Sequence, residues 1–141
     1  MIGLHNLKTQ AGWARLYCCL AGVLFALQGL VVLGLYSVKG FDTPPEAMPF
    51  NFQIDPLHGL LHLVTGLIAT YIGFWKTDWT IRFVQVFSLF YIGLALLGTF
   101  TVWNFGLRLG SEENNFHWTI GLITAAIGFG PLLFAARPKA T

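Results

Sequence analysis

Residues 54–68 read IDPLHGLLHLVTGLI and open the second of four long apolar segments. An aspartate and a proline directly before an apolar run are typical of a helix start, because aspartate caps free N–H groups and proline fits the first turn. Two of the four histidines in the chain, His58 and His62, lie in the first turns of this helix. Residues four apart share a helix face, so we expect both imidazoles on the same side.

The composition indicates a membrane protein. Of 141 residues, 55% are hydrophobic and 10% are charged, whereas a soluble domain carries about 25% charged residues. Apolar segments at about 16–38, 57–75, 80–103 and 116–136 are each long enough to cross a hydrocarbon core of about 30 Å as a helix. The sequence therefore predicts an all-α fold: a single four-helix transmembrane bundle over residues 1–141, in contact with the lipid bilayer.

The charges predict how the bundle is oriented. Six basic residues belong to the N-terminus, the short connection between the second and third segments, and the C-terminus: Lys8, Arg15, Lys76, Arg82, Arg137 and Lys139. The opposite side holds only two basic residues and most of the acids: Lys39, Arg108, Asp42, Glu46, Asp55, Glu112 and Glu113. By the positive-inside rule, both termini are cytoplasmic. No basic run typical of nucleic-acid binding is present, so we expect no nucleic-acid partner.

The second and fourth segments share a pattern. HLVTGLIATYIGF at 62–74 aligns with HWTIGLITAAIGF at 117–129, which pairs His62 with His117. The first and third segments match more weakly, VVLGLY against ALLGTF. The simplest interpretation is a duplicated helical hairpin. The glycines in this pattern are typical of close helix packing in lipid, and Gln28 and Gln85 are expected to form interhelical hydrogen bonds.

The repeat extends the histidine pattern into a candidate site. His58 and Glu113 each stand four residues before the paired histidines, so one helix offers His58 and His62 and the other offers Glu113 and His117. If these faces converge, three imidazoles and a carboxylate suit a transition metal such as Zn, Fe, Cu or Mn. Two further carboxylates, Asp55 and Glu112, are candidates to hydrogen-bond the outer imidazole N–H groups.

Two other interpretations of the same residues stay open. His62 and His117, with His58 as a further candidate, would bind a chlorophyll-type pigment or a haem through an axial imidazole nitrogen. Alternatively, the histidines and acids bind no ligand and only stabilise the helix N-termini. There a carboxylate caps free N–H groups and interacts with the positive end of the helix dipole. Ionisable residues inside a membrane usually indicate a functional site, but we expect these histidines and acids near the edge of the membrane.

DPLHGLLHLVTGLI at 55–68 and NNFHWTIGLI at 114–123 carry a family resemblance. The chain resembles bacterial membrane proteins grouped as domain of unknown function 4383, which show Asn or Asp and then His-x-x-x-Gly where a helix opens. That resemblance implies a bacterial inner (plasma) or thylakoid membrane. The chain is more distantly similar to four-helix DoxX-like proteins, which implies quinone or redox chemistry. Its long proline-containing outer loop matches neither group.

The sequence thus predicts a non-enzymatic role. We expect a small accessory subunit of a larger photosynthetic or respiratory membrane complex, with histidines near the outer surface holding a pigment, haem or metal. The first alternative is a small metal- or haem-dependent redox enzyme linked to quinone. The second is a small carrier or channel, which the scarcity of ionisable residues at membrane depth supports poorly.

Overall fold

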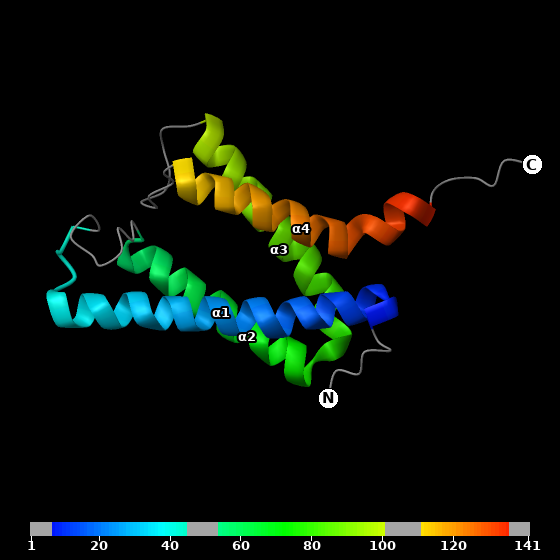
Figure 1. The fold of residues 1–141 in the computed structure, drawn as a ribbon, viewed down its shortest axis with the longest axis horizontal. Coiled ribbons are helices and arrows are strands. Elements are labelled where there is room, and N and C mark those ends of the chain that lie inside the picture. Colours follow the sequence, from blue (N-terminus) through cyan, green and yellow to red (C-terminus); the bar gives the residue numbers. More distant parts are fainter. Residues whose placement is uncertain (1–6, 45–53, 101–110, 136–141) are drawn as a thin grey trace, which may run out of the picture.

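The computed structural model describes residues 7–44, 54–100 and 111–135, with side chains to residue 130, and these ranges contain four α-helices and no strand. The helices are α1 (Gln10–Lys39), α2 (Pro56–Trp75), α3 (Thr80–Phe100) and α4 (Ser111–Ala135), and a short 3-10 turn, η4 (Thr77–Trp79), joins α2 to α3 (Figure 1). The predicted all-α fold is confirmed.

Three segments are long and apolar enough to cross a membrane: α1, α2, and η4 with α3. Only 28–33% of the residues in these spans are buried inside the protein, so most of their apolar surface faces outward. Within the described residues α4 is not among these spans, so a fourth crossing stays a prediction. Three helices of this length and apolarity are consistent with contact between this chain and a lipid bilayer.

Two helices begin earlier than the sequence analysis predicts. The first starts at Gln10 instead of residue 16, and the Thr9 side chain caps it by accepting a hydrogen bond from the Gly12 N–H at 3.1 Å. The fourth starts at Ser111 instead of residue 116. Hydropathy marks the apolar part of a helix, but the polar first turn and its cap come before that part. The predicted ends at residues 103 and 136 lie outside the described residues.

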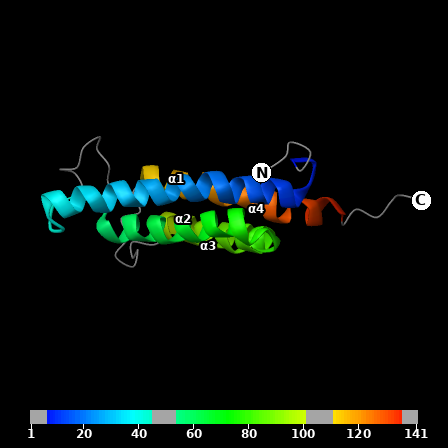
Figure 2. The ribbon, with the colours of Figure 1, turned by 90° about the horizontal axis from the view of Figure 1, so that it is seen from below.

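The helices pair as two antiparallel hairpins, α1 with α2 and α3 with α4 (Figure 1). Seen from the side, α1 and α4 form one layer and α2 and α3 the other (Figure 2). The end of α1 and the starts of α2 and α4 lie at one end of the molecule, and the start of α1, η4 and the end of α4 lie at the other. This arrangement brings the first turns of α2 and α4 to the same end.

Glycines allow α1 and α2 to pack backbone to backbone. A Cβ atom at Gly66 would lie 2.7 Å from the Gly22 carbonyl oxygen and would also meet the Ala26 nitrogen. A Cβ atom at Gly29 would lie 2.5 Å from the Gly59 carbonyl oxygen. Gly59, Gly66 and Gly73 recur every seven residues on α2, and Gly22 and Gly29 are seven apart on α1, a spacing that keeps them on the contact face of a left-handed helix pair.

Matching glycines pack α4 on α3. A Cβ atom at Gly121 would lie 2.8 Å from the Ile92 side chain, and one at Gly128 would lie 3.0 Å from the Gln85 side chain. Each of these glycines therefore faces the first helix of its own hairpin, as Gly66 and Gly73 do in the other hairpin.

Two glutamine side chains donate hydrogen bonds to backbone carbonyl groups of α4 near its proline. Pro131 lacks an N–H group, so the carbonyl of Ile127 loses its usual helical partner. The Gln10 side chain donates to the Ile127 oxygen at 3.1 Å and to the Gly128 oxygen at 2.8 Å, and Gln85 also donates to the Gly128 oxygen at 2.8 Å. The predicted interhelical role of Gln85 is confirmed. The last turns of α4 change direction beyond this point (Figure 1).

Aromatic side chains join the two hairpins along α1 and α3. The Phe25 ring lies 5.9 Å from that of Phe87 and 6.0 Å from that of Tyr91, measured between ring centres. In the described residues α2 and α4 share no comparable backbone contact. These two helices therefore lie on opposite sides of the bundle. Only their side chains can reach across the space between them.

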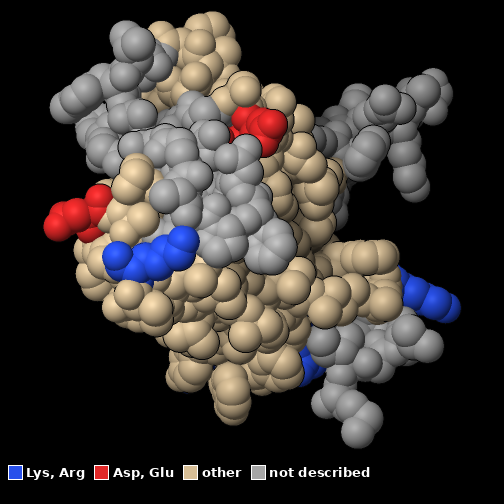
Figure 3. Space-filling view, turned by 60° about the vertical axis from the view of Figure 1, so that its left-hand side comes forward, with Lys and Arg blue, Asp and Glu red and all other residues tan. Residues whose placement is uncertain are grey.

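Charged side chains gather at the two ends of the molecule. Figure 3 brings the left-hand end of Figure 1 forward and shows acidic side chains on it. Between the ends, large apolar side chains are exposed on every helix, for example Leu24, Leu30, Leu67, Trp75, Leu89 and Leu122. An apolar belt between polar ends fits the two interfaces of a membrane.

Candidate functional site

The start of α2 places two histidines on the inner face. The Asp55 carboxylate caps the helix by accepting the His58 backbone N–H at 2.8 Å, and Pro56 occupies the first turn. His58 and His62 are only 5% and 4% exposed, and their ring centres are 4.5 Å apart. The expectation that both imidazoles share one helix face is confirmed.

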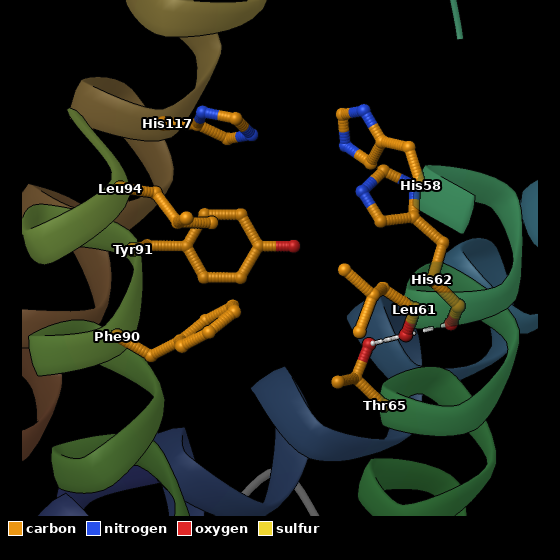
Figure 4. Close-up of a pocket in the computed structure, with 8 residues that line it drawn as sticks. All are labelled: His58, Leu61, His62, Thr65, Phe90, Tyr91, Leu94 and His117. Atoms are coloured by element: carbon orange, nitrogen blue, oxygen red, sulfur yellow. Dashed lines mark hydrogen bonds between the residues drawn. The ribbon is translucent and has the colours of Figure 1, made fainter. Parts of the chain in front are cut away.

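The third histidine reaches the same place from α4. His117 lies in the second turn of α4 and is 1% exposed. Its ring centre is 5.7 Å from that of His58 and 5.4 Å from that of Tyr91 on α3. Although α2 and α4 lie across the bundle, their histidines meet between them (Figure 4).

A small cavity separates the three histidines. Its volume is about 10 Å³, roughly the least that admits one water molecule or ion. The Tyr91 ring extends into the space from α3, with its hydroxyl directed toward α2 (Figure 4). Besides the histidines and Tyr91, the lining residues are Leu61, Thr65, Phe90 and Leu94.

Each of the three imidazoles has a buried nitrogen with no hydrogen-bond partner. These atoms are Nδ1 of His58, Nε2 of His62 and Nδ1 of His117, and they make up half of the six such side-chain atoms in the described residues. Leaving a buried polar atom unpaired costs about 1–3 kcal/mol. Three such costs around one cavity indicate that something polar belongs there.

The other nitrogen of His62 is held from α1. Nδ1 of His62 lies 3.0 Å from the side-chain oxygen of Gln28, and the Phe25 ring packs against the imidazole with ring centres 5.0 Å apart. The interhelical hydrogen bond predicted for Gln28 is thus confirmed. His62 is positioned by two residues one turn apart on α1.

The carboxylates of the predicted site lie at its edge. Glu113 is half-buried in the first turn of α4 but does not line the cavity, and Glu112 is exposed. Asp55 caps α2 through the His58 backbone instead of an imidazole N–H. The charges of Asp55 and Glu113 nevertheless act on His58.

As the side chains lie, the described residues contain no group of three or more His, Cys, Asp or Glu close enough to hold a metal ion. Besides Thr65, Tyr91 is a polar residue of the cavity wall that the sequence analysis did not single out. It lies inside an apolar helix with no pattern to separate it from a packing residue, so no sequence signal marks it.

The Asp55 cap gives a first prediction. Replacing Asp55 with alanine should lower the free energy of unfolding by about 1 kcal/mol, whereas asparagine should keep the wild-type value because it caps equally well. Denaturant unfolding in detergent micelles, followed by tryptophan fluorescence, measures both variants. If asparagine destabilised the protein as much as alanine, the charge of Asp55 and not its capping bond would be the important feature.

No protein-family model, no curated protein and no solved structure matches this chain. The resemblance to the family of domain of unknown function 4383 and to DoxX-like proteins therefore rests on the two motifs quoted above.

Proposed function

We propose that this chain is a small integral membrane protein that holds one transition-metal ion between His58, His62 and His117. The observation that carries the proposal is that three buried imidazoles, from helices across the bundle, line one cavity, and that each has a buried nitrogen without a hydrogen-bond partner. Neutral imidazole nitrogen is a good ligand for Zn, Cu, Fe and Ni. Four-helix bundles commonly build metal sites from inward side chains of facing helices.

The ring spacing supports a metal ion as the occupant. Imidazoles bound to one ion at about 2.0–2.1 Å have ring centres about 5 Å apart. The observed separations are 4.5 Å between His58 and His62 and 5.7 Å between His58 and His117. Binding then requires the His58 and His117 rings to turn within the cavity, a side-chain adjustment that is common at binding sites.

The surrounding charges also favour a cation. A metal dication buried in a membrane is costly unless negative charge lies nearby. Asp55 and Glu113, at the start of α2 and in the first turn of α4, are carboxylates whose charges act on the site through His58. They supply that charge without lining the cavity.

A tetrapyrrole does not fit this site. The cavity of about 10 Å³ is far smaller than a haem or chlorophyll ring, and the histidines that would bind the pigment point into it with at most 5% of their surface exposed. We therefore propose a metal ion, and neither a pigment nor a haem, as the occupant of this site.

The proposal places the protein in a larger membrane complex as an accessory subunit. The support is the apolar belt exposed on every helix, which suits other membrane subunits as well as lipid. We propose a photosynthetic or respiratory complex of a bacterial inner or thylakoid membrane, as the family resemblance implies. Purification in mild detergent tests this role: co-purifying membrane subunits support it, and a monomer without partners contradicts it.

The duplicated hairpin and the orientation belong to the same proposal. The paired histidines have similar surroundings, because His62 contacts Phe25 on α1 and His117 contacts Tyr91 on α3. The basic residues at the start of α1 and around η4 favour cytoplasmic termini, with α4 as the fourth crossing. A reporter fused to the C-terminus that fluoresces only in the cytoplasm should be bright, and a dark reporter with an active periplasmic counterpart would contradict this orientation.

Elemental analysis tests the metal directly. Protein purified in detergent, incubated with Zn²⁺ or Cu²⁺ and then desalted should retain about one ion per chain. The variant His5→Ala changes the only histidine outside this cluster and should retain the same amount. Retention that did not differ between wild type and a His58→Ala, His62→Ala, His117→Ala triple variant would refute the proposal and leave water as the occupant of the cavity.

A further inference from the structure

We infer that Gln28 fixes the proton of His62 on Nδ1 and so directs the lone pair of Nε2 at the cavity. The two residues come from different helices, α1 and α2, and Gln28 does not line the cavity itself. Gln28 is thus a positioning residue that acts through His62. Its effect on metal binding rests on the proposed function, but its effect on the tautomer does not.

The chemistry of the hydrogen bond assigns the tautomer. The side-chain oxygen of Gln28, 3.0 Å from Nδ1 of His62, can only accept a hydrogen bond. With the amide oxygen of Gln28 facing the ring, Nδ1 carries the hydrogen. A neutral imidazole has one N–H, so Nε2 holds a lone pair. That atom is one of the buried nitrogens without a partner, and the ring that carries it lines the cavity.

The packing of α1 on α2 explains how Gln28 reaches His62. Gly29 follows Gln28 in sequence and brings the backbone of α1 against Gly59 and Leu63 of α2. At this separation a glutamine side chain spans the space between the helices. Phe25, one turn earlier on α1, packs against the imidazole and limits its rotation. The ring is thus held by a hydrogen bond at Nδ1 and by an aromatic contact.

Holding the outer nitrogen of a histidine is a common way to prepare it as a metal ligand. The hydrogen bond fixes the tautomer and the ring orientation and makes the free nitrogen more basic. Losing such a partner typically lowers metal affinity by about 10–100-fold. We expect Gln28→Leu to lower affinity by about this factor, because Nε2 of His62 then carries the proton in part of the molecules.

Nitrogen NMR of metal-free protein labelled with ¹⁵N-histidine tests the tautomer without any metal. Wild type should show a protonated Nδ1 and an unprotonated Nε2 for His62, assigned by the signals missing in His62→Ala. Gln28→Leu removes the acceptor and should shift this pattern toward a protonated Nε2. A protonated Nε2 in wild type would overturn the inference, and so would an unchanged pattern in Gln28→Leu.

Gln85→Leu is the matched control. Gln85 is also a glutamine at membrane depth that bonds a neighbouring helix, but its partner is the Gly128 carbonyl oxygen. Its loss should leave the His62 signals and the metal affinity at wild-type values. If Gln28→Leu failed to fold, the wild-type spectrum would still decide the tautomer. A correct tautomer in a protein that retains no metal would refute the proposed function and leave this inference standing.

Discussion

Replacing His117 with alanine should lower metal affinity by about 100-fold or more in a protein that remains folded. The loss of an outer hydrogen-bond partner alone costs about 10–100-fold, and the loss of a ligand atom should cost at least the upper end of that range. His117 is the informative position because it is the only site histidine contributed by the α3–α4 hairpin. Competition with a metal-binding dye measures the affinity.

Leu94→Ala provides the control for this variant. Leu94 lines the same cavity but offers no ligand atom, so its truncation enlarges the space and leaves the three imidazoles in place. Affinity should stay within a few-fold of wild type. Equal losses in His117→Ala and Leu94→Ala would show that packing around the cavity, and not the imidazole of His117, determines binding.

Replacing Gly66 with alanine should destabilise the protein by about 3 kcal/mol or more. The added Cβ atom would meet the backbone of α1 at Ala26 and at the Gly22 carbonyl oxygen. Overpacking against movable side chains costs about 1–3 kcal/mol, and here the obstructing atoms are backbone that can yield only if the helices separate. Separation would also weaken the contact between Gln28 and His62. Denaturant unfolding in micelles measures the free energy of unfolding.

Gly34→Ala is the matched control, because a Cβ atom at Gly34 would meet nothing within 4 Å. Alanine is about 1 kcal/mol better than glycine in a helix interior, so this variant should be neutral or more stable. If Gly66→Ala were as stable as Gly34→Ala, the close approach of α1 and α2 would not be what holds this hairpin together.

The sequence was sufficient for the helical class and for the inward face of α2. Apolar length predicts the helices, and the spacing of His58 and His62 predicts that their rings lie on one side. The Asp55 cap also follows from local sequence. The starts of α1 and α4 were predicted too late, because hydropathy does not register the polar turn that precedes an apolar segment.

Local sequence could not predict that the histidines of α2 and α4 lie close together. Whether His117 approaches His58 depends on how the hairpins cross, which is set by aromatic contacts such as Phe25 with Tyr91. The size of the cavity depends on the same packing, so the sequence could not separate a small ion from a large pigment. Glu113 has the right spacing on its helix, yet it stands outside the cavity lining.

X-ray absorption spectroscopy of the metal-loaded protein is the most direct test of the central claim. The account predicts a first shell that includes three nitrogen ligands at about 2.0–2.1 Å, with the outer-shell scattering that imidazole rings produce. In His117→Ala the imidazole contribution should fall by about one third. A first shell made of oxygen atoms without imidazole scattering would contradict a metal site at His58, His62 and His117.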